Sequence, residues 1–561
     1  YFKQPFGAVR AGQSVHLTLR IPEELGYVDP HLVIQKEGKY DVPVHYRMKF
    51  DGQTPKQNHF SVDLTLNDVG LYFYYFDLYT DFRRIVRGPD NCGVVSWQDG
   101  EKWQITVYEA DFRTPETFKG KVFYQIFPDR FCEGVENKPM PFPDRLYQAD
   151  KHAEPFWQPN ETGGHLNEDY FGGDLKGIQL KLPYLHEMGV DYLYLNPIFE
   201  AHSNHRYNTA DYLNVDPLLG TNEDFETLCK EAAKYGIGIV LDGVFSHTGS
   251  DSRYFNREGR YGEGGAYRDP NSPYRSWYDF DPKYKGGYRS WWGFETLPEV
   301  NEENPSYVEF ITGKGGVIDT WLRRGAAGFR LDVADELPDA FIEKIRAAVK
   351  RVSPEKFLLG EVWEDATTKY GFGHRRTYLL GKGLDSVMNY PFKNAVLDFV
   401  KGKPAQQAMN EILSICEHYP APALNTALNF LSTHDTERAL TVIADEPANG
   451  RGREWQSGRN VSGEAYEEGM LRLRMAYAII YTLPGLPCLY YGDEIGMQGY
   501  RDPFNRGYYC WDSHEERLKP VLAQLAQLRH SCEAFRTGAL RVLRAEGGVL
   551  HYPRVGATAA A

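Results

Sequence analysis

Between residues 122 and 494 the chain alternates short apolar runs with longer segments in which apolar residues recur every three or four positions. Short apolar runs bounded by turn residues are typical of strands buried on both faces, and the longer segments are typical of the helices that cover them. This alternation predicts an α/β protein built on a (β/α)8 barrel, the TIM barrel. The eight predicted strands are 122–127, 190–196, 237–242, 326–332, 357–361, 384–389, 427–432 and 486–494.

The first 116 residues have a different pattern. Apolar and polar residues alternate in segments such as 14–21, 59–66 and 71–79, and Gly, Pro and Asn turns separate these segments. Alternation with a period of two at short intervals predicts a β-sandwich. We therefore expect an N-terminal sandwich at 1–116 and a barrel domain at 117–535.

Two further segments depart from the barrel pattern. Residues 248–301 are rich in Gly, Tyr, Arg, Ser and Trp and interrupt the barrel after the third strand, which predicts an inserted domain B. A loop this long inside a compact domain is usually functional. After the last predicted helix, at 518–532, we expect residues 536–561 to form only the beginning of a C-terminal β domain.

Composition narrows the classes of partner. The chain has 561 residues and a formal charge of −14, and no run rich in Lys or Arg is present, which argues against nucleic acid and anionic membranes. No apolar run reaches the roughly 18 to 20 residues of a membrane span, so we expect a cytoplasmic location. The seven scattered cysteines lack paired spacing and are expected to be reduced. The 39 Tyr and 10 Trp residues suit stacking on sugar rings, although most should fill cores.

Four segments place a carboxylate directly after an apolar run. They are DGVFSH (242–247), GFRLDVADE (328–336), GEVWE (360–364) and FLSTHD (430–435). Because parallel barrel strands end at one shared mouth, these carboxylates should meet there. A lone Asp at a strand end is more often a helix cap. A set of carboxylates at one mouth is, however, what retaining cleavage of a glycosidic bond requires, with two of them roughly 5 to 5.5 Å apart.

In this order the four segments resemble the conserved regions of the α-amylase superfamily, glycoside hydrolase family 13, across residues 121–532. LPEVN (297–301) resembles the family's fifth region. Together with SNHRYNTADY (203–212) and SVMNYPF (386–392), it indicates the neopullulanase, cyclomaltodextrinase and maltogenic amylase group. Members of that group carry an N-terminal starch-binding sandwich that often closes over a partner's active site. The resemblance thus implies that the N-terminal domain is either starch-binding-like or a dimerisation element of a homodimer.

The resemblance assigns the chemistry to three carboxylates. It implies that Asp332 is the nucleophile, Glu361 the general acid/base and Asp435 the carboxylate that holds the distorted sugar. Arg330 precedes the nucleophile by two residues, so on a strand its side chain points the same way, and it should keep Asp332 ionised. Repulsion from Asp332 and Asp435 should keep Glu361 protonated in the free enzyme.

The resemblance also implies a set of substrate contacts around these carboxylates. They are His247 and His434 as partners of sugar hydroxyls, Tyr207 as a stacking ring with His205 beside it, Trp363 on the leaving side, Asp242 as a supporting carboxylate, and Glu299 at the rim.

This chain departs from the group pattern near the leaving-side subsites. Glu299 stands where the group usually has Lys, Asn208 where Asp is common, and Glu364 where His often follows the Trp. One hypothesis is that Glu299 and Glu364 make the rim more acidic. The preference between α-1,4 and α-1,6 bonds stays open.

Relatives bind Ca²⁺ where an Asn/Asp-rich turn after the first barrel strand meets a GGD segment. Here FGGD (171–174) is present, but the turn FPDRFCEGVEN has few of the oxygen ligands that a hard cation requires. We therefore expect no required cofactor. We interpret Gly173 and Asp174 as turn-forming residues and keep them as the candidates for a Ca²⁺ site.

These observations predict a retaining hydrolase of short or cyclic maltodextrins and of pullulan. Transfer to sugar acceptors should accompany hydrolysis, because a glycosyl-enzyme can be intercepted by water or by a second sugar. Two related alternatives are a 4-α-glucanotransferase and an α-1,6 debranching enzyme. A non-catalytic glucan-binding protein is a more distant alternative, because such proteins usually lose residues of the triad and this chain has all three.

Overall fold

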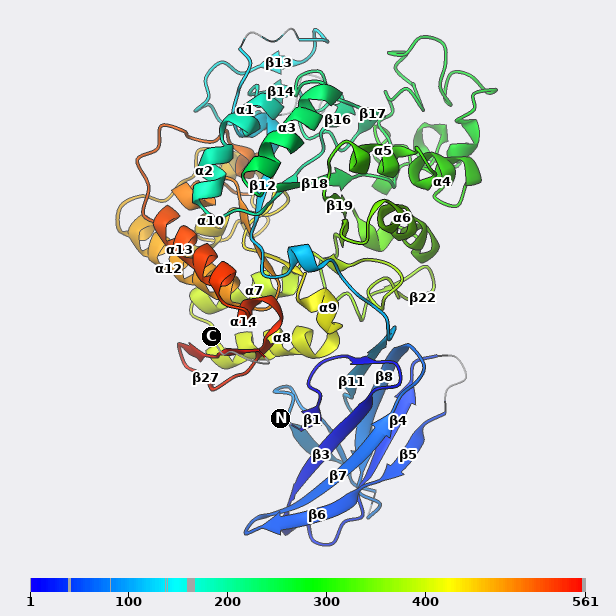
Figure 1. The fold of residues 1–561 in the computed structure, drawn as a ribbon, viewed down its shortest axis with the longest axis vertical. Coiled ribbons are helices and arrows are strands. Elements are labelled where there is room, and N and C mark those ends of the chain that lie inside the picture. The colour runs from blue at the N-terminus through cyan, green and yellow to red at the C-terminus, as the bar shows by residue number, and fades with distance from the viewer. Residues whose placement is uncertain are drawn as a thin grey trace.

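The computed structural model describes residues 2–38, 42–80, 82–136, 138, 140–158 and 167–556. Figure 1 shows a β-rich domain, in blue, at one end of an elongated molecule and a larger domain of strands and helices at the other. The chain passes from the first to the second at about residue 110. The descriptions that follow apply to these residues only.

Eight parallel strands form the barrel, in the order β23-β20-β19-β18-β15-β12-β25-β24. A parallel bridge between Met388 and Leu428 closes the ring between its first and last strands. Seven strands lie inside predicted runs and β18 extends one residue beyond its run, to Gly243, so the predicted (β/α)8 barrel is confirmed. The strands are β12 (Phe123–Ile126), β15 (Tyr192–Leu195), β18 (Gly238–Gly243), β19 (Gly328–Leu331), β20 (Phe357–Gly360), β23 (Ser386–Val387), β24 (Leu428–Phe430) and β25 (Leu486–Tyr490).

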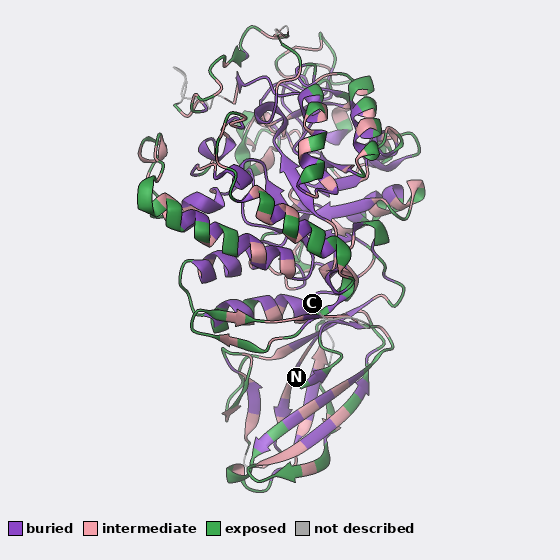
Figure 2. Cartoon of the chain, turned by 60° about the vertical axis from the view of Figure 1, so that its left-hand side comes forward, coloured by how far each residue is buried: buried purple, intermediate pink, exposed green. Residues whose placement is uncertain are grey.

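Helices surround the strands, and Figure 2 shows that several of them have a buried face and an exposed one. Residues 175–187 form two helices that meet at Lys181, because Pro183 lacks an amide donor and starts a new helix. The helices are α1 (Leu175–Leu180), α2 (Leu182–Glu187), α3 (Asn222–Lys234), α4 (Pro305–Thr312), α5 (Val317–Arg323), α6 (Asp339–Val352), α7 (Tyr390–Val400), α8 (Ala405–His418), α9 (Ala421–Leu424), α10 (Ala439–Ala444), α11 (Arg453–Gln456), α12 (Gly463–Thr482), α13 (Lys519–Ser531) and α14 (Ala534–Thr537).

The N-terminal domain consists of two sheets that share one apolar core. Alternate residues of β3, from Val15 to Ile21, are buried in this core, as the period of two predicts. One sheet contains β1 (Lys3–Gln4), β3 (Ser14–Pro22), β7 (Gln57–Thr65) and β6 (Lys49–Thr54). The other contains β2 (Val9–Arg10), β4 (His31–Lys36), β5 (Val44–Arg47), β8 (Gly70–Asp77), β9 (Arg84–Arg87), β10 (Gly93–Ser96) and β11 (Trp103–Tyr108).

The inserted segment 248–301 contains no strand or α-helix in the structure; its turns are packed around aromatic side chains. Buried rings include Tyr254, Phe255 and Trp277. An isolated bridge between His247 and Glu299 joins the two ends of the segment. The insertion is therefore held by aromatic packing and lies against the end of β18.

Short two-stranded sheets complete the described part of the chain. They pair β13 (Leu146–Tyr147) with β14 (Asp169–Tyr170), β16 (Phe199–Ala201) with β17 (Thr209–Val215), β21 (Tyr370–Gly371) with β22 (His374–Arg375), β26 (Ala539–Leu540) with β29 (Arg554–Val555), and β27 (Arg544–Glu546) with β28 (Val549–His551). All seven cysteines are free thiols. Among the described helices, none has both the length and the apolar character that a membrane crossing requires.

The link between the two domains closes the lower end of the barrel. Phe118, in the link, is buried; its ring centroid lies 4.0 Å from that of Tyr192 and 4.5 Å from that of Phe357. Tyr192 begins β15 and Phe357 begins β20, so the three rings cover the amino ends of these strands. The link thus completes the core at the end of the barrel opposite the catalytic carboxylates.

We expect Phe118→Ala to lower the free energy of unfolding of the barrel by about 3 to 5 kcal/mol, because it removes a buried ring and leaves a cavity. Urea and thermal unfolding of the variant and the wild type measure this change. Phe82→Ala is a matched control, since Phe82 is 90% exposed. Equal stability of the two variants would show that the ring does not support the barrel.

Candidate active site

Four carboxylates gather at the carboxyl end of the barrel. Asp242 lies at the end of β18, Asp332 directly follows β19, and Glu361 directly follows β20. Asp435 lies in the loop after β24. The first three are buried, whereas the side chain of Asp435 is 32% exposed. The structure therefore brings the three predicted catalytic carboxylates to one mouth, with Asp435 on its solvent side.

One guanidinium joins three of these carboxylates. Nη1 of Arg330 donates to Oδ1 of Asp242 and to Oδ1 of Asp332, both at 2.8 Å. Nη2 of Arg330 lies 2.9 Å from Oε2 of Glu361. Because alternate residues of a strand point the same way, β19 aims Arg330 at the mouth that Asp332 occupies. Asp332 and Glu361 are thus held at the same mouth by the two nitrogens of one guanidinium.

Glu361 receives further donors from its neighbours. The amide of Val333 donates to Oε2 and the indole Nε1 of Trp363 donates to Oε1, each at 2.9 Å. Val333 has a φ of 40°, a left-handed conformation that is strained for a β-branched residue. The sequence prediction that repulsion keeps Glu361 protonated does not include these donors. Oε1 accepts from Trp363 and keeps a second lone pair, which can carry a proton.

Burial raises the pKa of Asp332 well above the usual value for an aspartate, and the negative charges of Glu361, Asp242 and Asp435 add to this effect. Arg330 opposes the shift, but its single positive charge is shared among three carboxylates. The sequence prediction that Arg330 keeps Asp332 ionised therefore describes only part of the balance. The excess of carboxylates over cations in the cluster thus favours the protonated form of Asp332.

A hydrogen-bond network positions the Tyr207 hydroxyl beside the cluster. The hydroxyl donates to Oδ2 of Asp242 at 2.7 Å and accepts from Nδ2 of Asn196 at 3.0 Å. Nε2 of His434 lies 2.6 Å from the same oxygen, and Nε2 of Gln125 lies 3.0 Å from Nδ1 of His434. Because Gln125 donates to Nδ1, the ring proton of His434 is on Nε2 and points at Tyr207.

Tyr207 and His434 are stacked, with ring centroids 5.3 Å apart and an interplanar angle of 5°. Burial lowers the pKa of His434 well below its usual value, and the charges of Arg506 and Arg330 lower it further. His434 is therefore neutral at physiological pH. A neutral imidazole with a fixed tautomer can hydrogen-bond a sugar hydroxyl without adding charge to the cluster.

His247 and His205 support the backbone around Tyr207. Nε2 of His247 lies 3.1 Å from the carbonyl oxygen of Tyr207, and Nδ1 of His205 accepts from the Tyr207 amide at 3.0 Å. Burial lowers the pKa of His247 to about 4 and that of His205 to about 3. Both rings are thus neutral, and their predicted contacts with sugar hydroxyls stay predictions.

The two glutamates of the predicted acidic rim have cationic partners in the structure. Glu299 forms an ion pair with Arg289, and Glu364 forms one with Lys369 at 2.7 Å. The sequence hypothesis omitted these cations because neither lies in a recognisable segment. Lys369 also pairs with Asp335 at 2.8 Å, so it faces two carboxylates, and the acidic rim stays a prediction.

Glu336, four residues after Asp332, holds two indoles of the insertion at the mouth. Nε1 of Trp291 donates to one oxygen of Glu336 at 2.7 Å, and Nε1 of Trp292 donates to the other at 3.0 Å. Trp292 has a φ of 51° and a side chain that is 76% exposed. Together with Trp363, 44% exposed and stacked on Tyr390, it gives the mouth two aromatic faces.

Several residues of the site were not identified from the sequence. Gln125 and Asn196 are polar residues in runs otherwise typical of fully buried strands. This contrast could have identified them as candidate site residues. Arg506 lies in a segment with no distinguishing pattern, and Glu336 ends GFRLDVADE, a segment from which only Arg330 and Asp332 were singled out. Their importance depends on tertiary contacts alone.

Gly173 and Asp174 have the turn-forming geometry that the sequence predicts. Asp174 caps α1, where its side chain accepts from the Gly177 amide at 2.6 Å. A Cβ at Gly173 would lie 2.1 Å from the carbonyl oxygen of Pro128, so only glycine fits. Both residues belong to the FGGD segment, which contacts the turn that follows β12.

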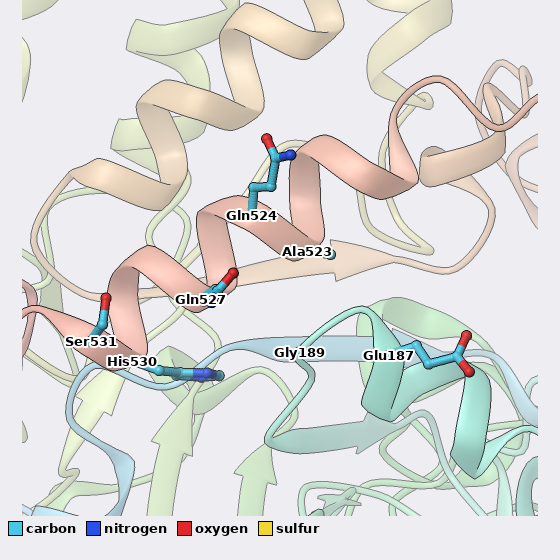
Figure 3. Close-up of a pocket in the computed structure, with 7 residues that line it drawn as sticks. All are labelled: Glu187, Gly189, Ala523, Gln524, Gln527, His530 and Ser531. Carbon is cyan, nitrogen blue, oxygen red and sulfur yellow. The ribbon is translucent and has the colours of Figure 1, made fainter.

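A separate hollow of about 500 Å³ lies on the outside of the barrel, between α13 and the end of α2 (Figure 3). Its lining residue His530 contacts Asp191, which directly precedes β15 and marks the opposite end of the barrel from the carboxylates. No Phe, Tyr or Trp lines it. The residues in Figure 3 are Glu187, Gly189, Ala523, Gln524, Gln527, His530 and Ser531.

Comparison with known proteins agrees with this geometry. Residues 125–536 match the family model described as "Alpha amylase, catalytic domain". An amylopullulanase from Thermoanaerobacter thermohydrosulfuricus is 34% identical over 615 residues, which cover 99% of this chain and 40% of that protein. Neopullulanase 2 from Thermoactinomyces vulgaris is 34% identical over 446 residues, which cover 78% of this chain and 67% of that protein.

Among solved structures, the type III pullulan hydrolase from Thermococcus kodakarensis has a TM-score of 0.67 and 26% identity to this chain. The match covers 98% of this chain and 90% of that one. This chain spans less than half the length of the amylopullulanases that it matches.

Asp435 should make the protein less stable as pH rises. Burial raises the pKa of Asp435 to about 7, and the charge of Glu361 adds to the shift. The native state therefore binds more protons than the unfolded state between about pH 4 and pH 7, and stability falls as pH rises through this window. We expect Asp435→Asn to be more stable than the wild type by about 1 to 2 kcal/mol at about pH 8, because solvent screens part of the shift.

Thermal unfolding at about pH 5 and about pH 8 measures the difference between the variant and the wild type. The difference should grow towards the higher pH. Asp51→Asn, at an exposed position of the N-terminal domain, is the control and should show no such growth. A difference that is independent of pH would contradict the raised pKa.

Proposed function

Because this chain belongs to the α-amylase family, we propose that it is a retaining glycoside hydrolase acting on α-1,4 and α-1,6 glucosidic bonds of short or cyclic maltodextrins and of pullulan. The names of its relatives, amylopullulanase and neopullulanase, support pullulan as a substrate. The single observation that carries the proposal is the placement of Asp332 and Glu361 on the two nitrogens of Arg330.

The mechanism follows from the placement of these groups. Glu361 gives its proton to the leaving glycosidic oxygen while Asp332 attacks the anomeric carbon, which forms a covalent glycosyl-enzyme. Glu361 then takes a proton from the incoming water, and the water oxygen replaces Asp332 on the sugar. Asp435 and His434, at the same mouth, are placed to hold hydroxyls of the distorted sugar. Two inversions at the same carbon retain the α configuration.

A sugar can replace water in the second step. The exposed rings of Trp292 and Trp363 offer apolar faces on which an acceptor sugar stacks. An acceptor held there is positioned to attack the glycosyl-enzyme in preference to bulk water. This favours a hydrolase with transfer activity. A 4-α-glucanotransferase or an α-1,6 debranching enzyme of the same family would differ in its products from maltotriose, cyclodextrin and pullulan.

The N-terminal domain has a feature that favours the starch-binding alternative over dimerisation. A hollow of about 640 Å³ is lined by the rings of Tyr27 and Phe50 and by polar side chains that include Arg47 and Asn58. Tyr27 and Phe50 are both exposed. Rings beside hydrogen-bonding groups are the combination that recognises a glucan.

We expect Asp332→Asn to lower kcat by at least about 10³-fold on β-cyclodextrin, pullulan and soluble starch, because the amide cannot form the glycosyl-enzyme. Polarimetry or NMR at early times should show α-configured products for the wild type. Asp335→Asn, three residues later on the same loop, is the control for folding and should stay active. β-Configured products from the wild type, or full activity of Asp332→Asn, would overturn the mechanism.

Trp292 should influence the transfer of sugar to acceptors. We expect Trp292→Ala to lower the ratio of transfer to hydrolysis about 3- to 10-fold, equivalent to about 1 kcal/mol of stacking. Glu336→Gln should lower it less, since the amide can still accept from one indole. Chromatography of products from maltotriose with added glucose measures the ratio. Trp97→Ala, an exposed Trp of the N-terminal domain, should leave the ratio unchanged, and a ratio unaffected by Trp292→Ala would remove Trp292 from the acceptor site.

A further inference from the structure

A cradle of oxygen atoms lies where the turn after β12 meets the start of α1. Its members are the backbone carbonyls of Phe171 and Gly172 and the carboxylates of Glu133 and Asp174. Carbonyl and carboxylate oxygens are the ligands of a hard divalent cation such as Ca²⁺. In this chain the oxygens already face cations of its own.

Lys138 fills one side of the cradle. Its Nζ donates to the carbonyl oxygen of Gly172 at 2.5 Å and forms an ion pair with Asp174. The side chain of Lys138 is only 12% exposed, and that of Asp174 is buried. The remaining acceptor sites of Asp174 are taken by the amides of Gly134, Val135 and Gly177. A buried carboxylate with this set of partners has no site left for a metal ion.

Lys151 fills the other side. Its Nζ donates to the carbonyl oxygen of Phe171 and lies 3.0 Å from Oε2 of Glu133. The hydroxyl of Tyr147 donates to both oxygens of Glu133 at 3.0 Å and lies 2.8 Å from Nζ of Lys151. Glu133 is therefore held by a lysine and a tyrosine.

The backbone holds the two carbonyls in place for these lysines. The amides of Phe171 and Gly172 donate to the carboxylate of Asp129 at 3.0 and 3.2 Å. Gly172 has a φ of 84°, and a Cβ there would lie 2.7 Å from Oε1 of Glu133. The amides thus face Asp129, and the carbonyls face the ammonium groups.

We propose that Lys138 and Lys151 act as built-in cations that take the place of a divalent ion at this turn. Two ammonium groups carry the same total charge as one Ca²⁺ ion, and they face the same two carboxylates that a Ca²⁺ ion would neutralise. The residues present do not fit a bound Ca²⁺ ion, because each of the four oxygen-bearing groups already contacts an ammonium group. Removal of the lysines opens a latent cation site.

The test compares the full chain with Lys138→Met/Lys151→Met in the presence of EDTA and in about 1 mM CaCl2, a concentration that fills weak calcium sites. The wild type should have the same Tm in both solutions. The double variant should have a Tm several degrees lower in EDTA, and CaCl2 should restore most of the loss. Equilibrium dialysis with Ca²⁺ should find one more bound ion per chain in the double variant than in the wild type.

Two controls distinguish the proposed role of the two lysines from a general effect of removing positive charge. Lys176→Met, at an exposed position of α1 close to the cradle, should behave as the wild type does. Lys138→Arg keeps the positive charge and should not gain a response to CaCl2. If the double variant does not fold in either solution, the single variant Lys151→Met is compared in EDTA and in CaCl2 instead. Lys151 is the more exposed of the two lysines, so its replacement should disturb the fold less.

A wild-type Tm that falls in EDTA would overturn the proposal, since it would mean that a metal ion displaces the lysines in the native protein. Variants that lose stability equally in EDTA and in CaCl2, with no additional bound ion, would also overturn it. The lysines would then be ordinary ion-pair partners.

Discussion

The site depends on one buried guanidinium. Arg330 is fully buried in β19 and contacts Asp242, Asp332 and Glu361 at distances of 2.8 to 2.9 Å. Without it, three carboxylates would share a cavity at high electrostatic cost. With it, they are drawn together but only partly neutralised. The same contact that makes the cluster stable enough to fold therefore also leaves it able to bind protons, which the proposed glycosidic cleavage requires.

Neutral groups surround this charged centre. Tyr207 and His434 are stacked and connected by hydrogen bonds to Asp242 and Gln125, and His247 supports the Tyr207 backbone. Burial lowers the pKa of both histidines, so neither adds a positive charge that would compete with Arg330 for the carboxylates. A network of fixed neutral donors and acceptors can orient a sugar while leaving the charge balance of the cluster to the arginine alone.

The sequence allowed the barrel and the catalytic carboxylates to be predicted because both depend on local pattern. Buried parallel strands are apolar on both faces, and the polar residues that end them stand out, as Asp332 and Glu361 do. The charge balance could not be predicted, because it depends on partners distant in the chain. Arg289 neutralises Glu299, and three N–H groups surround Glu361. The hypothesis of an acidic rim omitted these partners and stays a prediction.

Two clusters of opposite charges show what the balance achieves. At the turn before α1, Glu133 and Asp174 face two ammonium groups, and the charges cancel. At the barrel mouth, four carboxylates face Arg330 and the more distant Arg506, and negative charge is left over. A balanced cluster can only hold parts of the chain together, because adding or removing a proton costs free energy. An unbalanced one has protons to exchange near neutral pH. The difference in charge count, more than the kinds of residue, separates the structural cluster from the one that we propose to be catalytic.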